Sequence, residues 1–156
     1  LGDTTLPEVA QRHAGYASAH HARSVAVNSH LTRPVPFADR SIDADVKSLL
    51  RHEPRLDGIF ASSDLLAIAA IAELHRRGKR VPDDVAVVGY DDIAMARYCQ
   101  PPLTTVRQPI EAAGKALIDM LMAQLAGERP PSVQLQTELV QRATTRAVAP
   151  PTAARN

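Results

Sequence analysis

The sequence predicts an α/β protein in which a mostly parallel sheet is flanked by helices. Two short apolar segments, 58–61 and 85–88, are rich in small and β-branched residues, which is typical of strands that helices cover on both faces. Gly89 is expected to end the second of them. The segments around them carry apolar residues at every third or fourth position, which is typical of helices that lie on a sheet. Strands and helices therefore alternate with short connections, as in right-handed β–α–β units.

Each predicted helix carries boundary signals of its own. Ser63 is a natural N-cap for the helix that follows residues 58–61, and Gly78 is expected to stop that helix. Thr5 and Glu8 fit a capping box at the first helix of the chain. The predicted helices span about 6–21, 40–51, 64–77 and 108–125.

Two further strands are predicted after the central segment. Residues 103–106 resemble the earlier strands, and residues 133–140 alternate between apolar and polar side chains, as in a half-buried strand. Earlier in the chain, 25–27 and 33–37 fit short edge strands only. Residues 146–156 show no packing pattern and are predicted to form a disordered tail.

Length and composition exclude several classes of protein. With 156 residues, 45% hydrophobic residues and a formal net charge of +1, the chain is long enough for one core and is not strongly basic. Its Lys and Arg residues are scattered and aromatic residues make up only 3%, so we expect no DNA binding by this chain alone. No apolar run approaches the length of a membrane span. Cys99 is the only cysteine, which excludes an internal disulfide and fits a reducing cytoplasm.

The polar residues that follow 85–88 are the first candidates for a ligand site. In open parallel sheets, ligands bind beyond the carboxyl ends of the strands, which is where Tyr90, Asp91 and Asp92 are expected. An ionised Asp91 accepts hydrogen bonds from neighbouring hydroxyl groups, and Gln108 both donates and accepts, which suits a sugar or a nucleoside. The alternative role for Asp91 is that of a carboxylate that caps a turn. Tyr90 and Asp92 are expected to be structural.

The same residues do not suit catalysis. Asp91 and Asp92 are adjacent, so in an extended turn their side chains point in different directions rather than across one bond. The sequence contains no nucleophile elbow, phosphate-binding loop or metal-ligand set, and histidines such as His13 and His20 are expected at the surface. We therefore predict that the chain is not an enzyme and that it holds neither a cofactor nor a metal.

The central region is also the part of the chain that is most similar to a known family. VPDDVAVVGYDDIAMARYCQPPLTTVRQP, residues 81–109, resembles the signature region of the LacI/GalR family of bacterial transcription regulators, and DGIFASSDLLA, residues 57–67, resembles the strand and helix start that precede it. The resemblance runs from LGDTTLPEVAQRHAGY to TELVQRATT. It implies a periplasmic-binding-protein-like (type I) subdomain. Residues 1–145 would form the C-terminal part of an effector-binding domain, mainly its C-terminal subdomain, with 104–130 crossing toward a missing N-terminal subdomain.

The resemblance also implies further site residues. Arg12 matches an arginine that reaches into the family's cleft to bind the effector. Phe37 stands where the family often has an aromatic residue that packs on a sugar ring, and Ser63 replaces an asparagine that touches the effector. Taken alone, Arg12 fits a solvated helix residue, Phe37 a core residue and Ser63 a helix cap. With Asp91 and Gln108, these three residues form the predicted effector site.

The function implied by the resemblance is that of an effector-sensing domain in a cytoplasmic, homodimeric regulator. A sugar or nucleoside-like effector would bind this domain and alter the binding of operator DNA by a missing N-terminal helix-turn-helix. The family places the helix that begins at Ser63 near the twofold interface of the dimer. No membrane partner is expected. The alternative function is that of a sugar-binding protein of a transport system, because such proteins share the fold.

Overall fold

A computed structural model of the chain describes residues 2–35 and 42–146. Two predictions fall outside these residues: the role of Phe37 and the disorder of the tail beyond Arg146. Arg146, the first residue of the predicted tail, donates from Nη2 to the backbone oxygen of Asp83 at 3.0 Å.

The described residues form a four-stranded sheet with the strand order β1-β2-β3-β4. β2 is parallel to both of its neighbours, whereas β4 is antiparallel to β3. The prediction of an α/β protein with a mostly parallel sheet is therefore confirmed, and the carboxyl ends of the three parallel strands meet at one edge. The strands are β1 (Gly58–Phe60), β2 (Ala86–Asp91), β3 (Thr104–Arg107) and β4 (Glu138–Val140).

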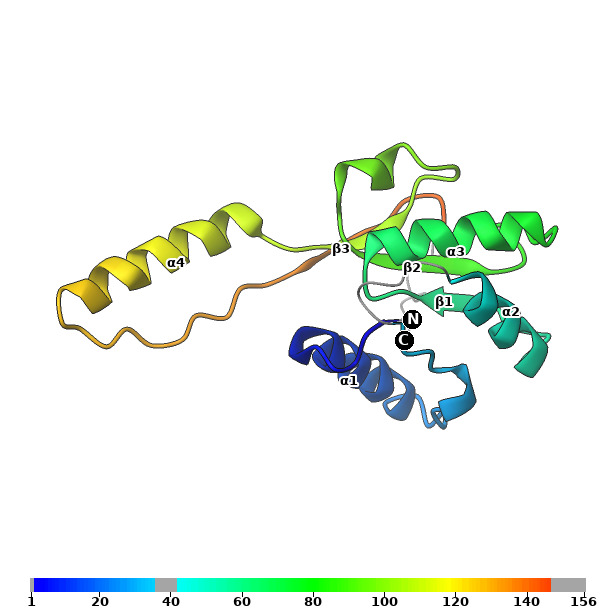
Figure 1. The fold of residues 1–156 in the computed structure, drawn as a ribbon, viewed down its shortest axis with the longest axis horizontal. Helices are drawn as coiled ribbons and strands as arrows, with labels where there is room; N and C mark the ends of the chain where they lie inside the picture. The colour runs from blue at the N-terminus through cyan, green and yellow to red at the C-terminus, as the bar shows by residue number, and fades with distance from the viewer. Residues whose placement is uncertain (1, 36–41, 147–156) are drawn as a thin grey trace, which may run out of the picture.

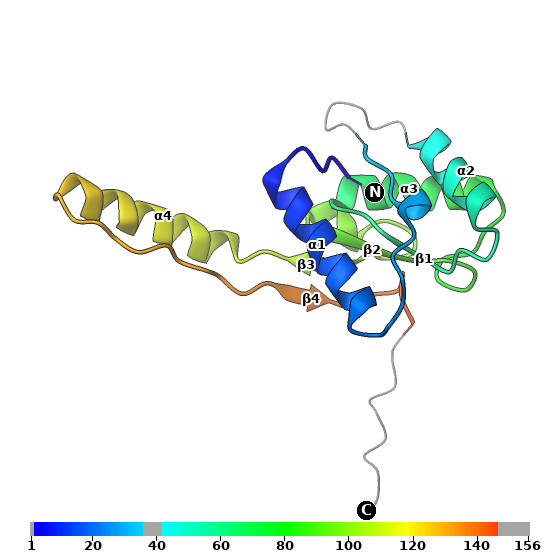
Figure 2. The ribbon, with the colours of Figure 1, turned by 90° about the horizontal axis from the view of Figure 1, so that it is seen from below.

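Helices lie on both faces of the sheet. The first helix, α1, covers one face, α3 covers the other, and α2 packs beside α3 (Figures 1 and 2). Among the described residues, no helix is long and apolar enough to cross a membrane. The predicted helices are all present within a few residues of their predicted bounds. They are α1 (Pro7–His21), α2 (Asp43–His52), α3 (Asp64–Arg76) and α4 (Ile110–Leu125), and the short 3-10 helices η1 (Ser29–Leu31) and η2 (Ala94–Arg97) lie between them.

The core lies between α3 and the sheet. α3 buries Ala67 and Ala70, whose small side chains let the helix approach the strands closely, and it also buries Ile71 and Leu74. Val87 of β2 belongs to the same buried cluster. This packing makes the sheet a fixed platform for the side chains at the ends of its strands.

The prediction that Gly89 ends a strand is wrong. β2 continues through Gly89 to Asp91, and Gly89 pairs with Thr105 of β3. A Cβ atom at position 89 would overlap Asp64 Oδ1 and lie 2.9 Å from Leu103 Cδ2. The glycine is therefore required by the close approach of α3 and not by a turn.

Other local predictions also differ from the structure. α1 begins after Leu6 without a side-chain cap, because the Thr5 backbone N–H and hydroxyl both donate to Asp3 Oδ1 instead of forming a capping box. Residues 25–27 are not a strand, and Pro34 makes one isolated bridge with Gly2. The strand predicted over residues 133–140 is shorter than expected, because only Glu138–Val140 is paired as a strand.

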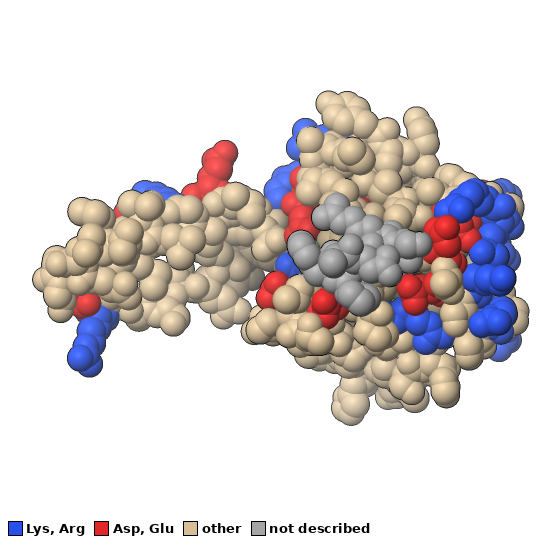
Figure 3. Space-filling model, in the orientation of Figure 1, with Lys and Arg blue, Asp and Glu red and all other residues tan. Residues whose placement is uncertain are grey.

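The arm consists of α4 and the segment that returns from it to β4, residues 110–137. It extends away from the rest of the molecule (Figures 1 and 2). None of the residues of α4 is buried. Figure 3 shows that charged side chains are sparse on the arm, whereas Lys and Arg gather at the opposite end of the molecule, near the end of α3. The apolar periodicity of α4 therefore predicted a helix correctly, although nothing among the described residues covers it. Its exposed large apolar residues are Ile110, Leu117, Ile118, Leu121, Met122 and Leu125.

Candidate ligand-binding site

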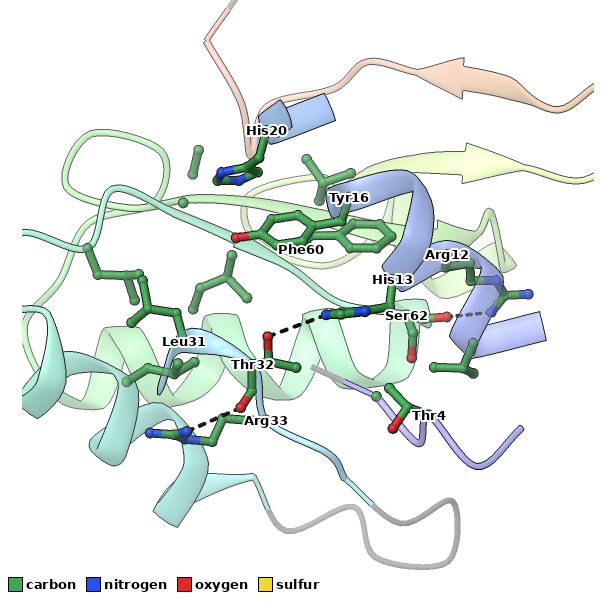
Figure 4. A pocket seen from close by; sticks show the side chains of 18 of the residues that line it. Thr4, Arg12, His13, Tyr16, His20, Leu31, Thr32, Arg33, Phe60 and Ser62 are labelled. Atoms are coloured by element: carbon green, nitrogen blue, oxygen red, sulfur yellow. Dashed lines mark hydrogen bonds between the residues drawn. The ribbon is translucent and has the colours of Figure 1, made fainter. Parts of the chain in front are cut away.

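Arg12 extends from α1 toward the carboxyl ends of the strands. Its Nη1 donates to the backbone oxygen of Ser62 at 2.6 Å (Figure 4), and its guanidinium carbon lies 3.8 Å from the centroid of the Tyr90 ring. The Arg12 side chain is only 15% exposed. These contacts exclude a solvated helix arginine, because a cation stacked on an aromatic face and bonded to a carbonyl is held in one place.

Asp91 is the last residue of β2 and faces Arg12. Its Oδ1 accepts a hydrogen bond from Gln108 Nε2 at 2.8 Å and lies 3.9 Å from Arg12 Nη2. Burial raises the pKa of the Asp91 carboxyl, although the charge of Arg12 and the hydrogen bond from Gln108 oppose the shift. The partners of the carboxylate thus come from α1 and from the residue that follows β3. These contacts do not support the alternative role of Asp91 as a cap of its own turn.

An open groove of about 600 Å³ lies beside these residues. Arg12, Tyr90 and Gln108 line it, and the rings of Tyr16 and Phe60 add apolar surface. Apolar rings with a few convergent polar groups are the usual composition of a small-molecule site. The groove is large enough for a ligand of the size of a sugar.

The neighbouring Asp92 has a different environment from Asp91. Its side chain is 3% exposed, and its carboxylate accepts hydrogen bonds from Arg107 Nε at 2.7 Å and from Arg142 Nη2 at 2.5 Å. Burial alone would raise the pKa of Asp92, but the hydrogen bonds and charges of Arg142 and Arg107 outweigh it, so its pKa is lowered. Asp92 therefore ties β2 to β3 and to the segment after β4, in agreement with the structural role predicted for it.

Comparisons with known proteins show the family of this chain. Residues 1–145 match the family of periplasmic binding protein-like domains. The chain belongs to that family. It is 38% identical over 128 residues to the HTH-type transcriptional regulator CelR of Thermobifida fusca, which covers 82% of this chain and 38% of CelR. The chain thus spans less than half the length of that relative.

Solved structures give the same result. A complex of the transcriptional regulator CelR with cellobiose is similar with a TM-score of 0.79 and 37% identity, over 86% of this chain and 42% of that one. A sugar-binding regulator of the LacI family from Escherichia coli, solved with phosphate, is similar with a TM-score of 0.83 and 32% identity, over 96% and 53% of the two chains. The resemblance to LacI/GalR regulators is therefore confirmed.

The periplasmic binding protein-like domain brings together three of the five predicted site residues: Arg12, Asp91 and Gln108. Ser63 follows Ser62, the partner of Arg12, but its Oγ accepts a hydrogen bond from the backbone of Leu66 at 3.4 Å and caps α3. Phe37 lies outside the described residues. Its part in the site, like the ligand contacts of the other four, stays a prediction.

Sequence reasoning did not predict that Tyr90 lines the candidate site. It assigned the residue a structural role, whereas the structure places the ring under Arg12 and in the groove. A signal was present in the sequence, because side chains alternate along a strand. Val87 and Gly89 are buried against α3, so Tyr90 has to face the opposite side, where α1 lies.

A second cavity, of about 390 Å³, lies between α1 and the sheet (Figure 4). His13, Thr32 and Phe60 are among its lining residues, and the ring of His13 lies 3.4 Å from the Thr32 hydroxyl. Ala86 and Val88 of β2 also line this cavity, and it shares Arg12, Tyr16 and Phe60 with the groove. Tyr90 and Gln108 line the groove but not this cavity, so the groove at the strand ends is the candidate ligand site.

The described residues offer no metal centre, because no three His, Cys, Asp or Glu side chains among them are grouped to hold an ion. Arg12, Tyr90 and Gln108 line the groove and offer hydrogen bonding and stacking there. Asp91 adjoins the groove through its contacts with Arg12 and Gln108. Side chains of these kinds are suited to hydrogen-bonding the polar groups of a small molecule.

Proposed function

We propose that this domain is the effector-binding part of a LacI/GalR-type transcription regulator, and that a sugar is its effector. The observation that carries the proposal is the convergence of Arg12, Asp91 and Gln108 beside Tyr90 at the ends of the parallel strands. The relatives support it, because a CelR regulator of similar fold was solved with cellobiose.

The chemistry of the convergent residues suits a polyhydroxylated ligand. The Asp91 carboxylate accepts hydrogen bonds from two neighbouring hydroxyls, the Arg12 guanidinium donates two in parallel, and the Gln108 amide does both. The rings in the groove offer surface to the apolar face of a sugar. Phe37 and the Ser63 hydroxyl complete the proposed set of contacts. A nucleoside carries the same vicinal hydroxyls and is the second class of effector to test.

The arm supports the proposed division of the chain into subdomains. Residues 1–145 would be the C-terminal part of the effector-binding domain, and 104–130 would cross toward an N-terminal subdomain. α4 has no buried residue and exposes Leu117 and Leu125, so it carries an apolar face that a partner subdomain of the full-length protein would cover.

The proposal includes partners of the full-length protein. Effector binding would alter the binding of operator DNA by a helix-turn-helix outside this chain, and the regulator would work as a cytoplasmic homodimer without catalytic activity or a membrane partner. The alternative is a sugar-binding protein of a transport system. The relatives favour the regulator, since CelR and the Escherichia coli protein are both named as transcriptional regulators.

Thermal shift of the full-length protein tests the proposal, with cellobiose, ribose and adenosine as probes. A ligand at about 100 times its Kd stabilises the folded state by about 2.7 kcal/mol, which such a measurement detects readily. We expect a shift with at least one sugar, and loss of that shift in Arg12→Ala. If all three probes leave the melting temperature unchanged at millimolar concentration, the proposed effector class is wrong.

A further inference from the structure

Asp64 is a buried carboxylate whose partners lie far away in the sequence. It occupies the first turn of α3 and is 0% exposed. Its Oδ1 accepts a hydrogen bond from Thr105 Oγ1 at 2.5 Å, and its Oδ2 accepts one from the backbone N–H of Ile93 at 2.9 Å. The side chain therefore leaves its own helix and binds β3 and the residue that follows the Asp91–Asp92 turn.

The strand beside Asp64 is adapted to this carboxylate. Gly89 lies in the middle of β2, and a Cβ atom there would overlap Asp64 Oδ1. Because a glycine weakens a strand interior, its presence at the point where the carboxylate passes indicates a fitted contact. The turn just beyond is the one that carries Asp91.

That turn has an unusual backbone that requires support. Asp91 has a φ of 114° and Asp92 a φ of 51°, and residues with a side chain rarely adopt such angles. Two backbone N–H groups of the turn donate hydrogen bonds to these side chains. That of Ile93 donates to Asp64, and that of Asp92 donates to Thr105 Oγ1 at 3.4 Å. Thr105 thus accepts from the turn and donates to Asp64, so the two side chains act as one unit.

We propose that Asp64 is a positioning residue which, together with Thr105, fixes the turn so that the Asp91 carboxylate faces Arg12 and Gln108. Asp64 does not touch the ligand and acts through Asp91. Its effect on the turn is independent of any ligand, whereas its effect on affinity rests on the proposed function.

The chemistry of the site requires a carboxylate at position 64. The two donors, the Thr105 hydroxyl and the Ile93 N–H, approach different oxygens, and both oxygens of an ionised carboxylate accept. Asn has the same shape but only one accepting oxygen, so Asp64→Asn leaves one buried donor without a partner. Thr105→Val removes the hydroxyl at constant shape, and Thr105→Ser retains it.

The first experiment needs no ligand. Amide hydrogen exchange in the full-length protein should be about tenfold faster or more at Ile93 and Asp92 in Asp64→Asn and Thr105→Val, because a local opening becomes easier when these bonds are lost. Thr105→Ser should exchange at the wild-type rate. Asp83→Asn, which removes a carboxylate that is 52% exposed, serves as the control for the loss of a charge.

The second experiment measures affinity by calorimetry with cellobiose, ribose and adenosine. For a probe that binds the wild type, Asp64→Asn and Thr105→Val should weaken binding about tenfold, as expected when one positioned charged hydrogen bond is lost. Thr105→Ser should bind as the wild type does. In an Asp91→Asn background, Asp64→Asn should add less than about twofold, because a residue that acts through Asp91 has no effect once Asp91 is replaced.

The outcomes separate the positioning role from the proposed function. Faster exchange confined to the turn, with none of the probes bound by the wild type, would contradict the proposed function and leave the positioning role supported. Wild-type exchange at Ile93 in folded Asp64→Asn and Thr105→Val would overturn the positioning role. Faster exchange throughout the sheet, or unfolding of both variants, would overturn it as well, since Asp64 would then only stabilise the fold.

Discussion

α3 and α4 both follow the apolar periodicity of a helix, but only α3 buries its apolar residues. Leu74 of α3 is 0% exposed, whereas Leu117 of α4 is 67% exposed. α3 lies on β2, and α4 extends with the arm away from the sheet (Figure 1). Periodicity therefore predicts that a helix forms, but the surface that it packs on has to be supplied by other parts of the molecule.

The largest expected effect tests this difference directly. Leu74→Ala should lower the free energy of unfolding by about 2–5 kcal/mol, because it leaves a cavity in the core. The matched change Leu117→Ala should alter it by less than about 0.5 kcal/mol in the 156-residue chain, because that side chain is already in water. Urea denaturation measures both changes.

The same pair sharpens the comparison in the full-length protein. If an N-terminal subdomain covers α4, Leu117→Ala should there destabilise by about 2 kcal/mol or more. A loss below about 0.5 kcal/mol in the full-length protein would instead show that α4 stays exposed, and would contradict the proposed crossing of 104–130.

The next effect concerns the candidate site at the ends of the strands, which lies outside the arm. Asp91→Asn and Arg12→Ala should each weaken effector binding about tenfold to a hundredfold, because hydrogen bonds to charged groups contribute about 1.5–3 kcal/mol. Folding should be retained, since Asp91 ends a strand and is 32% exposed. Calorimetry with the probe that stabilises the wild type provides the measurement.

The control for these variants lies in the arm. Asp119 pairs with Lys115 on α4, and the two side chains are 62% and 78% exposed. Asp119→Asn should leave effector affinity unchanged. Wild-type affinity in Asp91→Asn would remove Asp91 from the proposed site, and the argument from the strand ends with it.

A smaller effect distinguishes glycines in the two kinds of environment. Gly89→Ala places a Cβ against Asp64 and Leu103, and should destabilise by about 1–3 kcal/mol as overpacking does. Gly114→Ala in α4 meets nothing within 4 Å, and should stabilise the helix by up to about 1 kcal/mol. Thermal denaturation compares the two. A stabilised Gly89→Ala would show that α3 does not approach β2 as closely as described.

The sequence predicted the elements of the fold better than their contacts. Helix periodicity is local, so the four α-helices of the described residues could be placed from the sequence alone. Gly89 was interpreted as a stop because a glycine after an apolar run fits both the end of a strand and a close approach. The structure decides between them through Asp64, which is separated from Gly89 by a whole helix.

The candidate site could be predicted only in part, because some of its contacts join residues that lie far apart in the sequence. The polar residues at the strand ends indicated Asp91 and Gln108, and the family resemblance added Arg12. The structure brings these three residues together. The role of Asp64 was not predicted, because Ile93 and Thr105 lie 29 and 41 residues away from it, and no spacing rule relates residues so far apart. A carboxylate at the start of a helix fits the helix dipole well enough to conceal its actual partners.

The smallest expected effect is a change in the pH dependence of stability. It compares Asp92, beside the sheet, with Asp119 in the arm. Hydrogen bonds from Arg142 and Arg107 lower the pKa of Asp92 in the folded protein despite its burial. A carboxyl with a lowered folded pKa contributes stability at pH above its unfolded pKa and loses that contribution as the pH falls toward the folded value. Asp64 has the opposite sign, because burial raises its pKa, so its contribution to stability increases on acidification.

Because the pKa values of Asp92 and Asp64 shift in opposite directions, Asp92→Asn tests the contribution of Asp92 specifically. Wild-type stability should fall below about pH 5, as the pH drops past the unfolded pKa of an aspartate toward the lower folded pKa of Asp92. The fall should be shallower in Asp92→Asn, which has no carboxyl to protonate at that position. The exposed pair of Asp119 and Lys115 in the arm is screened by water, so Asp119→Asn should reproduce the wild-type slope. Urea midpoints across this pH range give the three slopes. Equal slopes in the wild type and Asp92→Asn would show that the Arg107 and Arg142 contacts do not hold Asp92 in its charged form.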